Sequence, residues 1–266
     1  MSKESSSSFK NCCEPWYENN LDFQPELINE LFIAETSGHF WFLSRLEFIK
    51  ALFLKYVSKE SRVLDIGSGS GWIASRLSFL GFSIAVGDVH LKSLELARRA
   101  GIDECYIVNV YQPPFVDEFD VICLFDVIEH LDDDEKALFN VGRMLKAGGK
   151  VFITVPAHAW LWNSHDDLSG HKRRYTSRSL LQTVSNAGFR VIKSSYIFRL
   201  IVPLLLLRRL IGKMPESEKQ KSKKDLFSIN PVLNRILFGL CEIDRKMGEY
   251  LPDLFGGSIL LVAEKI

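Results

Sequence analysis

Three glycines at alternate positions follow a short apolar segment of the chain. The segment Arg62–Ile66 predicts a buried strand, and Gly67, Gly69 and Gly71 come directly after it. Glycine has no Cβ and tolerates positive φ, so such a turn lets the backbone bend sharply and approach a ligand closely. A helix that starts near Trp72 would aim its unpaired N–H groups at the same ligand. The pattern predicts a nucleotide-like ligand at the carboxyl edge of a parallel sheet.

Two aspartates accompany this turn. Asp65 lies in the predicted strand just before the glycines, and Asp88 follows the next apolar segment, Ser83–Gly87. In nucleotide-binding α/β folds, an acid about 20 residues past the glycine turn holds the two hydroxyls of a ribose. The alternatives are a surface acid in a loop and a glycine-rich turn that binds nothing. Because the turn and the acid occur together at this distance, we predict that Asp88 binds a ribose.

Histidines supply the candidate groups for acid–base chemistry. The candidates for taking a proton from an acceptor group are His130, His158, His165 and His171. For His130, a histidine that only forms a hydrogen bond at a helix start is an equal alternative. His165, Asp166 and His171 could ligate a metal together, but their spacing matches no known metal signature, so we predict no metal.

A long segment after the predicted strand Lys150–Val155 carries three of these histidines. It runs from Pro156 to Thr176 and also contains two tryptophans and three consecutive basic residues. Long loops of this kind are uncommon unless they are functional. Aromatic faces beside polar groups suit sugar or aromatic rings, and guanidinium groups suit phosphate or carboxylate. We predict substrate contacts from this loop, with a structural lid as the alternative; the residues are Trp160, Trp162, Arg173, Arg174 and Tyr175.

Strands and helices alternate around these residues. Apolar segments predict strands at Arg62–Ile66, Ser83–Gly87, Cys105–Asn109, Asp120–Phe125, Lys150–Val155, Phe189–Ser195 and Ser258–Ala263. Helices are predicted between them at about Trp72–Leu80, Lys92–Ala100, Asp133–Leu145 and Ser177–Ala187. This order predicts an α/β fold with a doubly wound, mostly parallel sheet of about seven strands and helices on both faces.

A tail and a helical cap are predicted before the first strand, in residues 1–61. Helices are expected near Pro25–Glu35 and Leu46–Tyr56, and an aromatic segment lies between them. That segment either packs under the sheet or closes over the ligand site. We assign its residues His39, Trp41 and Arg45 to substrate binding.

A helical insertion is predicted before the last strand, in residues 197–257. An apolar stretch, Tyr196–Ile211, begins at its boundary and is followed by the lysine-rich stretch Lys213–Lys224. One interpretation is a helical hairpin that packs on the core or on a partner chain. The other is that residues 197–224 dock on an anionic membrane and admit a lipid-linked acceptor. The cofactor-binding core is then formed by residues 62–196 together with 258–266.

Composition narrows the class of protein. The 266 residues are 47% hydrophobic and 25% charged, which suits one globular domain with additions. Basic and acidic residues both number 33, so the net charge is zero and no nucleic acid partner is predicted. Five cysteines without a CxxC pair, no signal-like start and no apolar run of ~18 residues predict a cytoplasmic protein. Under the membrane interpretation it would be peripheral at the inner membrane face; no oligomeric state is indicated.

Four stretches together resemble the class I S-adenosylmethionine-dependent methyltransferases. They are Val63–Gly71, Asp88, Phe119–Leu131 and Leu145–Pro156, within a match that covers roughly Val63 to Ser195. The His39–Phe42 segment, followed by Arg45, also resembles a bacterial subgroup of this family linked to cell-surface glycan or lipid metabolism.

The resemblance implies a role for each matching position. Asp65 and the Gly67–Gly71 backbone would face the methionine half of the cofactor, and Asp88 would take the ribose hydroxyls. Asn109 stands where the family usually has an acid for the adenine amino group, and its carbonyl oxygen could accept instead. Phe125 and Asp126 would lie beside the sulfonium. The implied cofactor-binding residues are Asp65, Gly67, Ser68, Gly69, Gly71, Asp88, Val89, Asn109, Val110, Phe125 and Asp126.

The predicted function is therefore that of an enzyme. We expect an S-adenosylmethionine-dependent methyltransferase that acts on a small-molecule or lipid-linked acceptor, most readily at oxygen. One alternative is a partner subunit that binds S-adenosylmethionine without methylating. A nicotinamide-dependent oxidoreductase is disfavoured, because the glycine spacing is GxGxG and no Tyr-x-x-x-Lys pair occurs.

Overall fold

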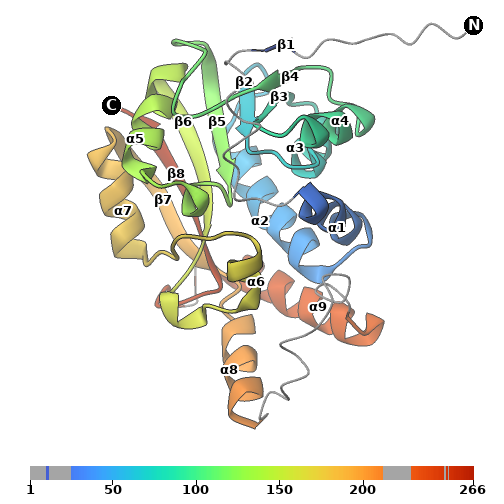
Figure 1. The fold of residues 1–266 in the computed structure, drawn as a ribbon. Helices are drawn as coiled ribbons and strands as arrows, with labels where there is room; N and C mark the ends of the chain where they lie inside the picture. Colours follow the sequence, from blue (N-terminus) through green and yellow to red (C-terminus); the bar gives the residue numbers. More distant parts are fainter. Residues whose placement is uncertain (1–9, 12–24, 212–228, 249, 251) are drawn as a thin grey trace, which may run out of the picture.

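An eight-stranded sheet runs through the part of the protein that the computed structural model describes, which is residues 10–11, 25–211, 229–248, 250 and 252–266 (Figure 1). The strands are β1 (Lys10–Asn11), β2 (Arg62–Ile66), β3 (Ser83–Asp88), β4 (Cys105–Ile107), β5 (Phe119–Phe125), β6 (Leu145–Pro156), β7 (Phe189–Ile197) and β8 (Ser258–Lys265). The α-helices are α1 (Pro25–Thr36), α2 (Phe40–Tyr56), α3 (Trp72–Ser78), α4 (Leu91–Arg99), α5 (Asp134–Met144), α6 (Ser164–Leu168), α7 (Ser177–Asn186), α8 (Ile201–Ile211) and α9 (Pro231–Met247). Two short 3₁₀ helices, η2 (Ile128–His130) and η3 (Ala159–Leu161), lie in the loops after β5 and β6.

The strand order confirms the predicted doubly wound sheet. The order is β1-β4-β3-β2-β5-β6-β8-β7; β8 is antiparallel to both of its neighbours and all other pairs are parallel. The chain moves outward from β2 first on one side and then on the other, so the carboxyl ends of β2, β3, β4 and β5 lie together at one edge. Such a reversal of strand order is where open α/β sheets bind ligands. Part of the predicted tail also joins the sheet, because Lys10 and Asn11 pair with β4.

Apolar side chains fill both faces of the sheet. Leu64, Ile122 and Leu124 point into a buried cluster under α5 and α7, whereas Val63, Val121 and Cys123 point into a second one under α2, α3 and α4. Neighbouring residues of the same strand thus enter opposite clusters, as the period of two in a strand requires. This explains why the strands read as continuous apolar runs in the sequence.

Helix α2 begins six residues earlier than the apolar spacing predicts. It starts at Phe40 instead of Leu46, and His39 caps it by accepting a hydrogen bond from the Trp41 N–H. The aromatic segment is therefore the first two turns of the helix and not a loop. Periodicity missed it because Phe40, Phe42, Ser44 and Arg45 are also buried, so this part of the helix has no polar face.

The predicted insertion between β7 and β8 contributes α8 and α9. Arg199 anchors α9, since its backbone N–H and its Nε donate to the buried Asp244 at 2.7 Å each. Asn234 of α9 reaches the start of α2, where its Oδ1 accepts from the Phe40 N–H at 2.8 Å. The ring of Trp41 stacks on Phe198 at 4.0 Å. These contacts join the insertion to the N-terminal helices, while the lysine-rich stretch Lys213–Lys224 lies outside the described residues.

Candidate active site

The three glycines of the turn after β2 have different roles. All have positive φ, at 69°, 56° and 70° for Gly67, Gly69 and Gly71. A Cβ on Gly67 would lie 2.6 Å from Val127, and one on Gly71 would lie 2.6 Å from Ala97. A Cβ on Gly69 would meet no described atom within 4 Å. Gly67 and Gly71 are therefore required by packing, and Gly69 faces the space in which a ligand could approach the backbone.

Asp88 holds the same turn from the end of β3. Its carboxylate accepts from the Gly69 N–H at 3.1 Å and from the His90 N–H at 2.8 Å, and the residue is only 5% exposed. Burial raises the pKa of Asp88, and His90 and the backbone donors oppose that shift. Each oxygen keeps lone-pair capacity beyond its backbone bond, which a hydroxyl donor could use.

Buried polar atoms near the turn have no partner among the described residues. They are Oδ1 of Asp65, Oγ of Ser68 and Nδ2 of Asn109. Buried polar groups are normally paired, so an unpaired set at a strand edge indicates a bound polar group. The Oδ1 of Asn109 accepts from the Tyr111 N–H at 2.9 Å and keeps one lone pair, so the predicted acceptor role stays open, while its buried Nδ2 is an unpaired donor. A ring nitrogen of a base would suit that donor better than an amino group would.

Helix α1 packs against the turn and contributes a residue that sequence reasoning missed. Ser70 in the turn donates to the carboxylate of Glu35, and burial raises the pKa of Glu35 to about 7. Nothing in the sequence around Glu35 indicates its contact with Ser70. Its role follows only from the packing of α1 against α2 and α4 (Figure 1).

Arg45 connects the turn to the end of β5. Its guanidinium lies 2.9 Å from Asp126 and donates to Thr154 at 3.1 Å, and Thr154 donates to Asp126 at 2.9 Å. Asp126 adopts a φ of 56°, which is strained for a residue other than glycine. The charge of Arg45 also lowers the pKa of Asp65, which burial nevertheless raises to about 8. One buried cation thus serves two carboxylates that the sequence placed on the cofactor side.

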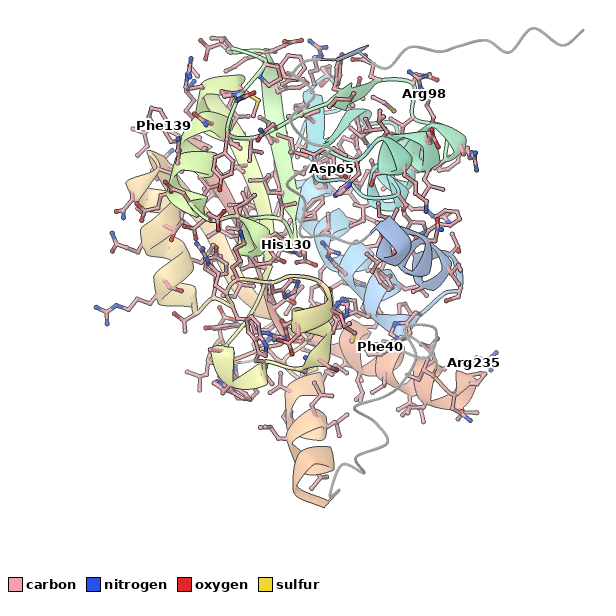
Figure 2. The ribbon with its side chains drawn as sticks, viewed as in Figure 1. Phe40, Asp65, Arg98, His130, Phe139 and Arg235 are labelled. Carbon is pink, nitrogen blue, oxygen red and sulfur yellow. The ribbon has the colours of Figure 1, made fainter. Side chains whose placement is uncertain are left out.

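Three of the four predicted histidines gather next to Asp126. The rings of His130 and His171 lie 4.7 Å apart, and those of His165 and His171 lie 6.1 Å apart. Burial and the neighbouring His171 lower the pKa of His130 to about 4, and the charge of Asp126 opposes this shift. Figure 2 shows Asp65 and His130 in the interior, between the sheet and the segments that carry α1 and α6.

His158 lies apart from this cluster. Its ring stacks on Tyr196 at 5.0 Å and on Trp160 at 5.2 Å, and burial lowers its pKa. Trp160 is half exposed, and Trp162 donates its ring N–H to Asp167 at 2.8 Å. His39 caps α2 and Trp41 packs on Phe198, so the structure gives both of them packing contacts.

The basic residues of the loop are paired within the protein. Arg174 donates to both oxygens of the buried Asp166 at 2.7 Å, and Arg173 lies 3.0 Å from Asp134. Tyr175 is buried and donates its hydroxyl to Asp134 at 2.6 Å. Through these contacts Arg173, Arg174 and Tyr175 hold the loop in place. The short helices η3 and α6 give the loop its remaining regular structure.

The remaining predicted residues complete the edge. Val89 follows Asp88, Val110 follows Asn109 and Phe125 precedes Asp126, so the whole predicted cofactor set lies at the carboxyl ends of β2, β3, β4 and β5. A glycine turn, an acid after the second strand of the core and unpaired polar atoms between them define a nucleotide-cofactor site of the doubly wound α/β class.

Comparison with known proteins identifies the family within that class. The family model described as "Methyltransferase domain" matches residues 36–194, and the chain belongs to this family. Relatives named "Ubiquinone biosynthesis O-methyltransferase" are 29% identical over 156 residues in Nitrosococcus oceani and 27% over 169 residues in Klebsiella pneumoniae. These alignments cover 52% and 58% of this chain, and the chain spans 64% and 62% of those relatives' own lengths.

Solved structures share the fold. A Thermotoga maritima S-adenosylmethionine-dependent methyltransferase, described as a "possible histamine N-methyltransferase", has a TM-score of 0.55 and 20% identity, and the match covers 90% of this chain and 99% of that one. Phosphoethanolamine N-methyltransferase 2 of Haemonchus contortus, solved with S-adenosylmethionine, has a TM-score of 0.54 and 21% identity, with coverage of 82% and 52%. The fold and the cofactor class, S-adenosylmethionine, are those predicted from the sequence.

Gly69→Ala is expected to weaken S-adenosylmethionine binding at least tenfold while lowering stability by only about 1 kcal/mol, because the new Cβ is strained at positive φ and enters the ligand space. Gly81→Ala is the matched control, since Gly81 also has positive φ and open space around it but lies in the turn after α3. Calorimetric titration and thermal melts of both variants measure the two effects. Equal affinity in G69A and G81A would remove Gly69 from the site.

Cofactor binding is expected to release a proton near pH 7. Asp65, with a pKa of about 8, is largely protonated in the free protein, and a cationic ammonium beside it would lower that pKa. The complex with the cofactor then binds fewer protons than the free protein, and the state with fewer protons is favoured as pH rises. The affinity for S-adenosylmethionine should therefore increase between pH 6 and 7.5, by up to about tenfold per pH unit. Titrations in phosphate and in Tris should give different heats for the wild type and equal heats for Asp65→Asn. Equal heats for the wild type would contradict the assignment.

Proposed function

We propose that this protein transfers a methyl group from S-adenosylmethionine to a hydroxyl oxygen of a small-molecule or lipid-linked acceptor. The observation that carries the proposal is the position of the histidine cluster beside Asp126, at the end of β5 and next to the glycine turn. A hydroxyl acceptor must give up its proton, which requires a base or a cation at the acceptor, whereas many amine and carbon acceptors need neither. The names of the relatives from N. oceani and K. pneumoniae support oxygen as the target atom.

The residues divide into a donor side and an acceptor side. S-adenosylmethionine supplies an activated methyl group on a sulfonium. On the donor side, Asp88 would accept the ribose hydroxyls, Asp65 would face the ammonium, and Asn109 would donate to the base. On the acceptor side, the histidine cluster would receive the hydroxyl group. Arg45 and Thr154 fix Asp126 between the two sides and so would set the alignment of the reacting groups.

Methyl-labelled S-adenosylmethionine tests the target atom. The full chain would be incubated with the label and with separate soluble and lipid extracts of cells that lack the protein, and the labelled products would be identified by mass spectrometry. We expect a methyl ether that has gained one CH₂ and lost one exchangeable hydrogen, and much less of it with Asp88→Ala when S-adenosylmethionine is not saturating. A labelled product methylated at nitrogen or carbon would contradict the assignment to oxygen.

We also propose that α8 and α9 hold the protein on an anionic membrane, where a lipid-linked acceptor would be available. Four consecutive leucines of α8, Leu204–Leu207, are exposed, and α9 exposes an apolar stripe along one side, made of Val232, Leu233, Ile236, Ile243 and Met247. In Figure 1, α8 projects away from the sheet. None of the described helices has the length and hydropathy needed to cross a bilayer. An exposed apolar helix face favours burial in lipid or against another surface.

Leu205→Asp is expected to reduce binding to anionic vesicles at least fivefold, because a carboxylate on α8 would be both desolvated and repelled. Phe139→Asp is the matched control, since Phe139 is also apolar and exposed but lies on α5, at the upper left of Figure 2 and away from α8. Vesicle flotation at low and high salt measures the effect. If wild type stays in the bottom fraction at low salt, the membrane proposal fails.

A further inference from the structure

Three side chains that can ligate a metal come together on the acceptor side of the site. They belong to Glu129, His130 and His171. One ligand atom from each residue lies within 4.8 Å of the other two. Glu129 and His130 belong to η2 at the end of β5, and His171 comes from the loop after α6. The loop is joined to η2 by the main chain, because the Lys172 N–H donates to the Glu129 carbonyl at 2.9 Å.

Glu129 is the most unusual member of this trio. It is 0% exposed, and neither of its carboxylate oxygens has a hydrogen-bond partner among the described residues. Burial, with the negative charge of Asp126, raises its pKa well above the usual range. Arg45 opposes this shift, but its guanidinium contacts Asp126 and Thr154. A carboxylate in such a position costs several kcal/mol unless a cation or a proton compensates it.

The two histidines are already oriented by other groups. His171 is bonded through Nδ1 to Asp166 at 2.7 Å, which leaves Nε2 as its second ring nitrogen. Burial alone would raise the pKa of Asp166, but the hydrogen bonds from His171 and Arg174 hold it well below its usual range. His130 has a hydrogen bond with the backbone of Gly170. A ligating histidine typically uses its other nitrogen in this way, bonded to a carboxylate or to a backbone carbonyl.

We propose that Glu129, His130 and His171 bind a divalent transition-metal cation of the Zn²⁺, Mn²⁺, Co²⁺ and Fe²⁺ group. Two imidazoles and one carboxylate are a common ligand set for these ions, and a fourth position stays open for water or substrate oxygen. Ligand atoms around such an ion lie roughly 3.4 Å apart, so a trio within 4.8 Å has to close by up to about 1.4 Å. This set differs from the one considered from the sequence, since Asp166 is turned toward Arg174 and supports His171 from behind.

The role of this metal site rests on the proposed function, whereas binding of the cation does not. A cation at the open position would hold the acceptor's hydroxyl oxygen and lower its pKa, as metal ions do for bound water. The buried, unpaired carboxylate would then have its compensating charge at the place where the acceptor enters. Binding of the cation itself can be measured without any acceptor.

Cobalt titration tests the site directly. The full chain, freed of metal with a chelator, is titrated with Co²⁺ while visible absorption is followed, and its melting temperature is measured with and without Zn²⁺. We expect one Co²⁺ per chain with visible absorption bands, and a higher melting temperature with Zn²⁺. Glu129→Gln and His171→Gln should weaken Co²⁺ binding by more than about 100-fold, because even supporting residues behind a ligand contribute 10–100-fold. Asp166→Asn should weaken it by about 10–100-fold.

Two controls separate metal binding from folding. His158→Gln changes a histidine of the same loop outside the trio and should keep wild-type Co²⁺ affinity. Glu129→Gln should melt no lower than the wild type without metal, because it replaces the buried unpaired carboxylate by a neutral amide. The proposal is overturned if the wild type binds neither Co²⁺ nor Zn²⁺ while it still binds S-adenosylmethionine, or if E129Q binds Co²⁺ like the wild type. Loss of S-adenosylmethionine binding with Co²⁺ binding intact would instead count against the proposed function.

Discussion

Arg45→Met is expected to lower the free energy of unfolding by about 3 kcal/mol. Arg45 is 8% exposed, and its removal would leave Asp126 without its partner at 2.9 Å. It would also remove the positive charge that lowers the pKa of Glu35, Asp65 and Glu129. Removing one member of a buried ion pair costs about 3–5 kcal/mol of stability. We expect the lower end of this range because the side chain of Asp126 is 28% exposed. Urea unfolding followed by circular dichroism measures this difference.

Arg62→Met is the matched control for this experiment. Arg62 also pairs with two acids, Glu104 and Glu118, but its side chain is 39% exposed at the amino end of β2. Exposed pairs contribute about 0–1 kcal/mol, so this variant should unfold almost like the wild type. The double variant R45M/D126N should recover part of the loss, since it removes the unpaired carboxylate as well. If R45M and R62M were equally stable, Arg45 would not have the central electrostatic role assigned to it.

Asp88→Ala is expected to weaken binding of S-adenosylmethionine by about 100-fold. A carboxylate that accepts two ribose hydroxyls forms charge-assisted hydrogen bonds of about 1.5–3 kcal/mol each, and part of that loss is offset by water. The variant also releases the Gly69 N–H from its 3.1 Å hydrogen bond, which loosens the turn. Calorimetric titration with S-adenosylmethionine and with S-adenosylhomocysteine measures the loss, which should be the same for both because they share the ribose.

Asp120→Ala separates this effect from a general loss of charge. Asp120 pairs with Lys146 and accepts from the Arg62 N–H at the amino end of β5, across the sheet from the proposed cofactor site. We expect it to bind both ligands with wild-type affinity. Wild-type affinity in D88A would show that the ribose is held by other residues and that Asp88 only orders the turn.

The cofactor side was predictable because its signal is local. The strand Arg62–Ile66, the three glycines and Asp88 are close in sequence, and each follows from backbone requirements that a reader of the sequence can recognise. Tertiary packing nevertheless determines what each of the three glycines does. Gly67 and Gly71 are set by contacts with Val127 and Ala97, which come from other elements, and only Gly69 faces open space.

The acceptor side was not predictable to the same extent, because tertiary contacts create it. Thr154 joins Arg45 to Asp126 from β6, and Glu129 is left unpaired by burial. No spacing rule connects residues this far apart in the chain. The candidate bases His130, His165 and His171 were the sequence signals that pointed to this place. Residue type indicated anion binding for Arg173 and Arg174, whereas the structure pairs them with Asp134 and Asp166, contacts that no spacing rule shows.

Equilibrium binding of S-adenosylmethionine tests the central claim most directly. The full chain would be dialysed against radiolabelled S-adenosylmethionine, with unlabelled S-adenosylhomocysteine as competitor and NADH as a second, unrelated nucleotide. We expect one bound S-adenosylmethionine per chain, displaced by S-adenosylhomocysteine and not by NADH. If no label is retained by the wild type, or if NADH displaces it as well as S-adenosylhomocysteine does, the site at the end of β2 is not the methyl-donor site described above.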